Sequence, residues 1–304
     1  MDTCIIPNLV HFVYLAKPER QLVPFLHFAA VASAKSILRP TKIILHLHGH
    51  PQGPWWERIR LLVDDIRLVN LPTHWSHDKP IYNPDKPHHH YPHMADHIRM
   101  HVLAESGGIY LDMDIIVIRP VEDLRKYEFV MGKETCSSVY DTAHLKLGSA
   151  VIMAAPGAAF LAEWLKRYPS VYDSEEWALA SSVLPATITE ERPDLAIHIE
   201  PETSFYSENW DDLPAIFEET NEVKPGAMIL HLWQNVSQHK YFRKVTGMEW
   251  ARQNRNTLCA KLLLNAALAG AWDGIDYETV TTGPPPHDAQ PNARADDPGH
   301  RSLP

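Results

Sequence analysis

The 304-residue sequence is poor in cysteine, and its three cysteines lie far apart, at Cys4, Cys136 and Cys259. An odd number of widely spaced cysteines excludes a disulfide framework and a C-x-x-C metal site within the chain, and it favours a reducing, cytoplasmic location. The N-terminus carries an acid, Asp2, where a secretory signal would be basic, and Pro7 interrupts the apolar stretch that follows. We therefore expect no secretory signal.

Two further absences limit the partners. No window approaches the ~20 consecutive apolar residues that a membrane-spanning helix needs, so no membrane span is expected. Lys and Arg number 28 against 38 Asp and Glu, which gives a net charge of −10, and no basic run is long enough to follow a phosphate backbone. Nucleic acid is therefore not expected as a partner.

The C-terminal segment 283–304 is rich in proline and almost free of apolar residues. Such a composition cannot bury enough surface to offset the entropy of ordering, so it predicts a disordered tail. Residues 1–282 show neither an internal repeat nor a linker, and the whole chain is 45% hydrophobic and 22% charged. We expect one folded domain over 1–282.

Strand-like and helical patterns alternate along the first part of the chain. Apolar, strand-length runs predict strands at 9–14, 43–48, 66–71 and 109–118. Helices are predicted between them, at about 24–39, 54–63 and 93–105. This alternation is typical of an α/β fold with a Rossmann-like, mostly parallel central sheet flanked by helices.

Beyond Pro120 the alternation loosens. Further strands are predicted at 129–132, 150–155, 196–199 and 227–232. Further helices are predicted at 157–167, 175–183 and 248–268.

Two acids, Asp112 and Asp114, stand inside the otherwise apolar run 109–118. An ionised carboxylate is costly to bury alone, so two in one strand require a cation or hydrogen-bond donors. Residues i and i+2 of a strand face the same side, about 6–7 Å apart, and can hold one divalent ion together. Carboxylates favour Mg²⁺ or Mn²⁺, which also bind diphosphates. A salt bridge at the end of the sheet is the structural alternative.

The helix that precedes this pair carries a second charged pair. Asp96 and Arg99 are three residues apart and share one face, where they can pair with each other or point over the edge of the sheet. Gly107 and Gly108 then end the helix and allow a tight turn into the strand.

The whole segment, D-x-x-R-x-x-x-L-x-x-x-G-G-x-Y-x-D-x-D from Asp96 to Asp114, resembles the signature of glycosyltransferase family 32. That family resembles the Golgi initiating mannosyltransferases and the catalytic domains of large glucosylating toxins, all with the GT-A fold. Residues 6–14 and 229–233 are similar to the family's first strand and to its C-terminal histidine-containing segment. The resemblance implies a GT-A hexosyltransferase that moves a sugar from a nucleotide sugar, with UDP favoured over GDP, to an acceptor hydroxyl with retention of configuration.

The resemblance also implies roles for individual residues. Asp114 is implied as a direct ligand of Mn²⁺ or Mg²⁺, His231 as the third protein ligand, and Asp112 as a ligand that also contacts the ribose or sugar. Asp96 and Arg99 are implied as contacts to the hydroxyls of the donor sugar. Five further residues are placed at the donor: His11, Tyr14, Gly108, Tyr110 and Trp233.

No carboxylate spacing identifies a nucleophile. Glu176 is a candidate catalytic residue, although an acid at the start of the predicted helix 175–183 also suits helix capping. The acceptor stays open among a glycan, a lipid-linked sugar, a small metabolite and a protein. Its contacts are expected in 134–147 and after Pro201.

Three other interpretations are open. A strand that ends in D-x-D also resembles the first motif of haloacid-dehalogenase-type phosphatases, in which the first Asp is the nucleophile. The chain could instead bind a nucleotide sugar without turning it over. His93, His97 and His101 share one helix face, but without the Glu of an H-E-x-x-H motif they predict stray chelation rather than a zinc enzyme. The run 88–90 is predicted as a solvated loop, and most of the 19 histidines as loop or surface residues.

Overall fold

The computed structural model describes residues 4–17, 21–76, 79–81, 90–135, 146–173, 176 and 178–268, and the predicted tail 283–304 lies outside them. Its centre is a seven-stranded sheet in the order β10-β8-β9-β6-β1-β2-β3. The strands are β1 (Leu9–Leu15), β2 (Lys42–His48), β3 (Asp65–Leu68), β6 (Gly108–Leu111), β8 (Phe129–Lys133), β9 (Leu147–Ala154) and β10 (His198–Glu200). Every neighbouring pair is parallel except the two that β9 forms, with β6 and with β8.

The central strands are mostly apolar because both faces of the sheet are covered. In β1 all five inner residues are buried, and β1 pairs with β2 in register from Leu9 opposite Lys42 to Leu15 opposite His48. Strands buried on both faces need near-continuous apolar runs, which is the pattern of the sequence. The predicted α/β fold, a mostly parallel central sheet flanked by helices, is confirmed.

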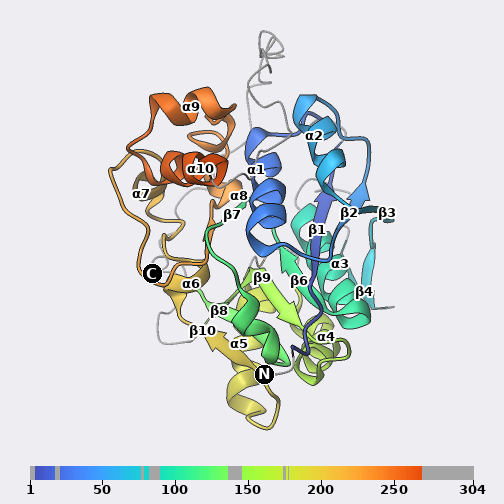
Figure 1. Cartoon of the computed structure of the whole chain (residues 1–304). Coiled ribbons are helices and arrows are strands. Elements are labelled where there is room, and N and C mark those ends of the chain that lie inside the picture. Colours follow the sequence, from blue (N-terminus) through green and yellow to red (C-terminus); the bar gives the residue numbers. More distant parts are fainter. Residues whose placement is uncertain are drawn as a thin grey trace, which may run out of the picture.

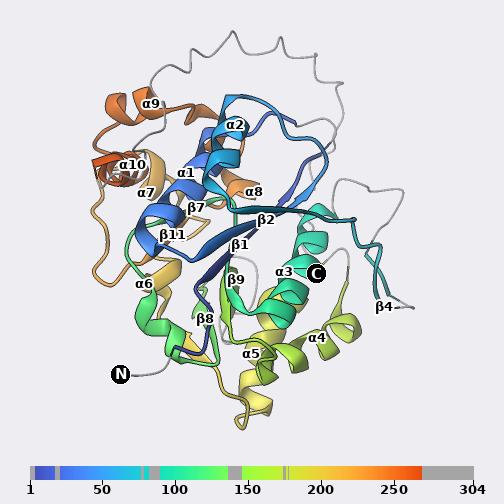
Figure 2. The ribbon, with the colours of Figure 1, turned by 45° about the vertical axis from the view of Figure 1, so that its right-hand side comes forward.

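Helices cover the two faces separately (Figures 1 and 2). One core contains residues of α1 (Phe25–Ser33), α2 (Pro54–Leu62), α7 (Leu213–Phe217), α9 (Met248–Gln253) and α10 (Leu258–Leu268). The other contains residues of α3 (Tyr91–Ser106), α4 (Ala159–Val171) and α5 (Leu184–Glu191). The remaining short elements are β4 (His74–Ser76), β5 (Lys79–Pro80), α6 (Glu202–Phe205), α8 (Gln234–Ser237), the π-helical turns Ala34–Leu38 and Leu179–Val183, and the 3-10 turns Glu122–Lys126 and Phe242–Lys244.

The predicted continuous strand 109–118 is wrong, and the difference creates the site. Strand β6 ends at Leu111, a turn covers 112–114, and β7 (Ile115–Val117) follows. β6 lies in the main sheet between β1 and β9, whereas β7 leaves that sheet and pairs antiparallel with β11 (Ile229–His231). The chain has to turn between these two pairings, so both acids lie at the carboxyl end of β6 instead of inside a strand.

Two helix predictions also need correction. The helix predicted at 175–183 begins only at Leu179, as a π-helical turn that continues into α5. The helix predicted at 248–268 is two helices, α9 and α10, and the hydroxyl of Thr257, directly before α10, accepts the N–H of Ala260 in the first turn of α10. In the part of the chain that the structure describes, no helix combines the length and apolar character needed to cross a membrane.

Candidate functional site

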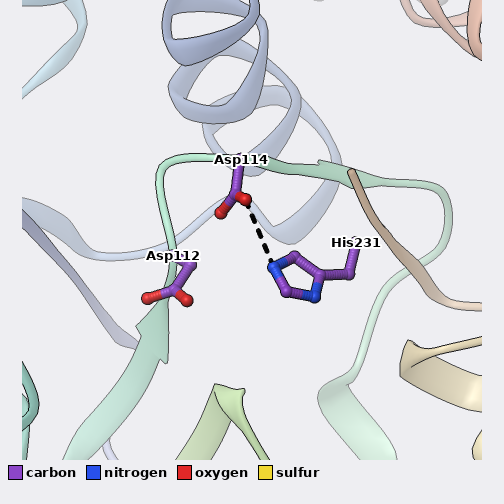
Figure 3. A group of neighbouring side chains, drawn as sticks. All are labelled: Asp112, Asp114 and His231. Carbon is purple, nitrogen blue, oxygen red and sulfur yellow. Dashed lines mark ion pairs between the residues drawn. The ribbon is translucent and has the colours of Figure 1, made fainter. Parts of the chain in front are cut away.

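Three side chains from two distant parts of the sequence converge beside the end of β6 (Figure 3). Asp112 and Asp114 come from the turn after β6, and His231 ends β11. One ligand atom from each lies within 4.8 Å of the other two. The pairing of β7 with β11 causes this, because it sets His231 opposite Ile115, one residue after Asp114.

Asp114 is held on both its backbone and its side chain. Its carbonyl oxygen accepts the N–H of Leu232 at 2.8 Å, and its Oδ2 accepts the N–H of Gln234 at 2.6 Å. Oδ2 also lies 3.3 Å from Nε2 of His231. Burial opposes ionisation, but His231 and the Gln234 N–H outweigh it and lower the pKa of Asp114 to about 2. Asp114 is therefore a fixed anion.

His231 is buried among charges and rings. Burial favours its neutral form, but Asp114, Asp112 and Glu134 together raise its pKa above the ordinary value of 6.5. The ring of Trp233 lies 4.1 Å away, centroid to centroid. Nδ1 of His231 is buried and has no hydrogen-bond partner among the described residues. The imidazole thus places positive charge beside Asp114, as the Arg99 guanidinium does beside Asp112.

Arg99 joins the charged pair of α3 to the turn after β6. Its Nη2 lies 3.2 Å from Asp96 and 3.3 Å from Asp112. Its Nη1 donates to the carbonyl oxygen of Ser149 at 2.7 Å, and its guanidinium lies over the ring of Tyr110, 4.6 Å from the centroid. The predicted pairing of Asp96 with Arg99 is present, and Arg99 also serves Asp112.

The Tyr110 hydroxyl completes the environment of Asp112. It donates to Oδ1 of Asp112 at 2.5 Å. Burial and the adjacent carboxylate raise the pKa of Tyr110 well above 10, so this hydroxyl keeps its proton. Burial also raises the pKa of Asp112; Arg99 opposes this shift, and the like charge of Asp114 adds to it. A cation bound between the two acids would relieve that repulsion.

The donor set fits a divalent ion. Carboxylates suit both Mn²⁺ and Mg²⁺, an imidazole suits a transition metal such as Mn²⁺ better than Mg²⁺, and the ligand atoms are already close together. Tyr110 and Arg99 hold Asp112, and Gln234 holds Asp114, as hydrogen-bonding neighbours commonly orient metal ligands.

His11 and Gly108 have structural roles. His11 is fully buried; its Nε2 lies 3.0 Å from the carbonyl oxygen of Gly107, and its Nδ1 lies 3.1 Å from Nε2 of His46. Both ring nitrogens are therefore used inside the sheet, and the predicted donor contact of His11 has no support in this geometry. At Gly108, φ is +112°, and a Cβ would lie 2.7 Å from the carbonyl oxygen of Leu9, which explains the glycine.

Of the remaining predicted residues, Trp233 contacts the three-residue cluster through His231. Trp233 stands beside His231 in a left-handed conformation with φ 54° and ψ 52°. Tyr14 is buried, packs edge-on against His27, and has its pKa raised by burial to about 12. Glu176 is exposed and precedes the π-helical turn Leu179–Val183, and its catalytic role stays a prediction.

Sequence reasoning missed Glu134, Tyr168 and His27. Glu134 follows β8. Burial and the charge of Asp112 raise the pKa of Glu134, and the charge of Glu134 in turn acts on His231. Tyr168 of α4 donates to Oδ2 of Asp96 at 3.1 Å. None of the three belongs to the signature. The only signal was the expectation that 134–147 contributes to the site.

The histidine predictions are partly wrong. His90, expected in a solvated loop, is buried, and so is His93. His97 and His101 stack on each other, with their centroids 4.0 Å apart. Among the described residues, the only group of three or more possible ligands is Asp112, Asp114 and His231, so the helix histidines form no metal site there.

Comparisons with known proteins identify the family of the chain. The family model described as "Glycosyltransferase sugar-binding region containing DXD motif" matches residues 44–130. The chain is 30% identical over 264 residues to Glucan organizing enzyme 1 of Cryptococcus neoformans var. grubii serotype A (strain H99). The aligned region covers 83% of this chain and 69% of that protein.

Solved structures of glycosyltransferases are also similar to this chain. GlyE of Streptococcus pneumoniae TIGR4 is 14% identical, with a TM-score of 0.44 over 84% of this chain and 63% of its own. The galactosyltransferase LgtC, in complex with donor and acceptor sugar analogs, is 13% identical, with a TM-score of 0.42 over 86% and 95%. On the family match and the identity to the curated relative, the chain belongs to the family of glycosyltransferases that share a sugar-binding region containing the D-x-D motif, and it is a glycosyltransferase.

Proposed function

We propose that this glycosyltransferase binds a divalent ion, Mn²⁺ or Mg²⁺, and moves a sugar from a UDP-sugar to an acceptor hydroxyl. The observation that carries the proposal is the convergence of Asp112, Asp114 and His231, whose ligand atoms lie within 4.8 Å of one another. When bound, the ion would supply positive charge beside the diphosphate leaving group, where negative charge grows during the reaction.

The residues of the chain would orient the donor around that ion. Asp114 stays ionised because His231 and a backbone N–H stabilise its charge. Arg99 holds Asp112 and Asp96 at fixed positions beside the cluster, where we place the hydroxyls of the donor sugar. Tyr110 saturates one oxygen of Asp112, which leaves the other oxygen for the ion or the sugar.

Three parts of the proposal rest on the sequence and the family resemblance: UDP as the nucleotide of the donor, retention of configuration, and a cytoplasmic location. The name of the curated relative refers to glucan, so UDP-glucose is the first donor to test and a glycan is the first acceptor. A lipid-linked sugar, a metabolite or a protein is the alternative acceptor.

The test is the release of nucleoside diphosphate from a panel of UDP-sugars and GDP-sugars, with and without Mn²⁺, using water or a supplied glycan as acceptor. We expect release from at least one UDP-sugar that stops when the ion is chelated and in D114N. The matched control is Asp123→Asn, an exposed acid of the turn Glu122–Lys126, which should leave release unchanged. Metal-independent release, or full release by D114N, would overturn the proposal.

The phosphatase interpretation is not supported. It requires a second acidic pair at the site, but Asp211 and Asp212 are exposed, and the family to which the chain belongs is one of glycosyltransferases. A protein that binds the donor without turnover would show Mn²⁺-dependent binding of a UDP-sugar and no release of UDP in the same assay.

A further inference from the structure

The carboxylate of Asp114 accepts a backbone N–H from a residue whose side chain is bonded to helix α1. Gln234 donates its N–H to Oδ2 of Asp114 at 2.6 Å. The side chain of Gln234 points elsewhere: its Oε1 lies 2.8 Å from Nε2 of His27 on α1, and its Nε2 donates to Gln238 at 3.0 Å. Its side-chain amide is therefore bonded at both ends.

The turn that presents this N–H is strained and needs such restraint. Trp233, directly before Gln234, has the left-handed backbone that bulky residues rarely adopt. Two hydrogen bonds restrain this turn. The indole N–H of Trp233 donates to the carbonyl oxygen of Glu208 at 2.9 Å, and the hydroxyl of Ser237 donates to the carbonyl oxygen of Leu232 at 2.9 Å. The bond from His27 restrains the side next to Asp114.

Among the described residues, the ring of His27 has one hydrogen-bond partner, the side chain of Gln234. It is buried in α1 between the rings of Tyr14 and Phe242, with centroid distances of 5.4 Å and 5.5 Å. An amide oxygen can only accept, so Nε2 of His27 carries the proton and donates it to Gln234. Its Nδ1 has no partner among the described residues, so this one bond is the polar contact that the buried ring makes there.

We propose that His27 is a positioning residue for the metal site: through the side-chain amide of Gln234, it holds the backbone N–H that orients Asp114. The proposal rests on the proposed function, because it assigns the ion to Asp112, Asp114 and His231. It adds a residue 87 positions before Asp114 in the sequence, outside the D-x-D signature, to the machinery that holds the ion.

The test measures the affinity for Mn²⁺ alone, from the electron paramagnetic resonance signal of the free ion, in the full chain without donor. His27→Leu removes the donor and keeps a buried apolar side chain, whereas His27→Gln keeps an N–H near the former Nε2. We expect H27L to weaken Mn²⁺ binding about 10-fold to 100-fold, as the loss of other supporting groups does. H27Q should recover to within about 3-fold of the wild type, a rescue that a purely packing role would not produce.

A double-mutant cycle tests the route through Gln234. Gln234→Leu removes the side-chain amide but keeps the backbone N–H, so H27L and Q234L together should weaken binding no more than the stronger single variant. His46→Leu is the matched control, a buried histidine of β2 outside this chain of bonds, and it should leave the affinity unchanged.

The outcomes separate the two proposals. If the wild type does not bind Mn²⁺, or if D114N binds it equally well, the proposed function fails. If the wild type binds and D114N does not, but H27L binds like the wild type or H27Q behaves like H27L, the role of His27 alone is overturned. Additive losses in the cycle would also overturn it.

Discussion

Nη2 of Arg99 lies 3.3 Å from Oδ1 of Asp112, although Arg99 belongs to α3 and Asp112 to the turn after β6. The same nitrogen lies 3.2 Å from Asp96 on its own helix. The Arg99 side chain is only 7% exposed, so carboxylates rather than water compensate its charge. One buried cation thus joins the helical part of the signature to the D-x-D turn.

Replacing Arg99 with Met should destabilise the metal-free protein by about 3–5 kcal/mol, because the buried Asp96 and the half-buried Asp112 then lose their shared partner. Urea unfolding at neutral pH measures the change. The control is Arg67→Met: Arg67 pairs with Asp65 at 3.0 Å, but the two side chains are 47% and 43% exposed. That loss should be about 1 kcal/mol or less. Equal losses in both variants would contradict the buried network.

Mn²⁺ binding should weaken as the pH falls. The surrounding carboxylates raise the pKa of His231, so the metal-free site holds a proton that the ion must displace. Below that pKa, the affinity should change by up to about tenfold per pH unit. Titrations with Mn²⁺ between pH 6 and 8 measure the slope, and calorimetry in two buffers measures the released proton.

His231→Gln provides the comparison for the pH dependence. It removes the titrating group but keeps a polar side chain, so Mn²⁺ should bind more weakly and with a flatter pH profile. A wild-type affinity that does not vary with pH, or a slope of equal size in H231Q, would show that the ion does not displace a proton from His231.

Gly148→Ala should disturb the site through the ring of Tyr206, which packs against His231. A Cβ at Gly148 would lie 2.2 Å from Cζ of Tyr206, whose ring packs edge-on against His231 with a centroid distance of 5.9 Å. Overpacking of this kind costs about 1–3 kcal/mol, and we expect weaker Mn²⁺ binding as well. Thermal unfolding and metal titration measure both effects. The double variant G148A/Y206L should recover part of the lost stability, and no recovery would locate the clash elsewhere.

The pair His11 and His46 should make the stability pH-dependent. Burial lowers the pKa of each from 6.5 to about 4. Between these values the unfolded chain binds protons that the folded chain excludes, so the stability falls as the pH falls from about 7 to 5. The expected loss is about 2 kcal/mol per histidine, measured by urea unfolding with chelator present. His46→Gln keeps an N–H donor but does not titrate, so its loss should be smaller; an equal loss would refute the assignment.

The sequence predicted the main sheet well because its strands bury both faces. The runs that became β1 and β2 are mostly apolar and are interrupted only by His11 in β1 and by Lys42, His46 and His48 in β2, and the strand and helix periods differ clearly on either side of them. The break between Leu111 and Ile115 had no local signal, since the apolar residues continue on both sides of the acids. It depends on β11, more than 100 residues later, which competes successfully for β7.

The site was predictable as far as the signature reaches. Asp96, Arg99, Asp112 and Asp114 lie close in sequence and meet in space. His231 came from the resemblance alone. The bond between His27 and Gln234 joins residues 207 positions apart and depends on the left-handed turn at Trp233, which no side-chain pattern indicates. The positions of the histidines were the hardest to predict, because an imidazole occurs both on the surface and in hydrogen-bonded pairs in the core.

The metal site is tested most directly by an anomalous difference map from crystals grown with Mn²⁺ and UDP. We expect one strong manganese peak, bound by Asp114 and His231 with Asp112 on the same ion, and the diphosphate of UDP beside it. A peak at His93, His97 and His101, or UDP bound with no manganese at the D-x-D turn, would contradict this expectation.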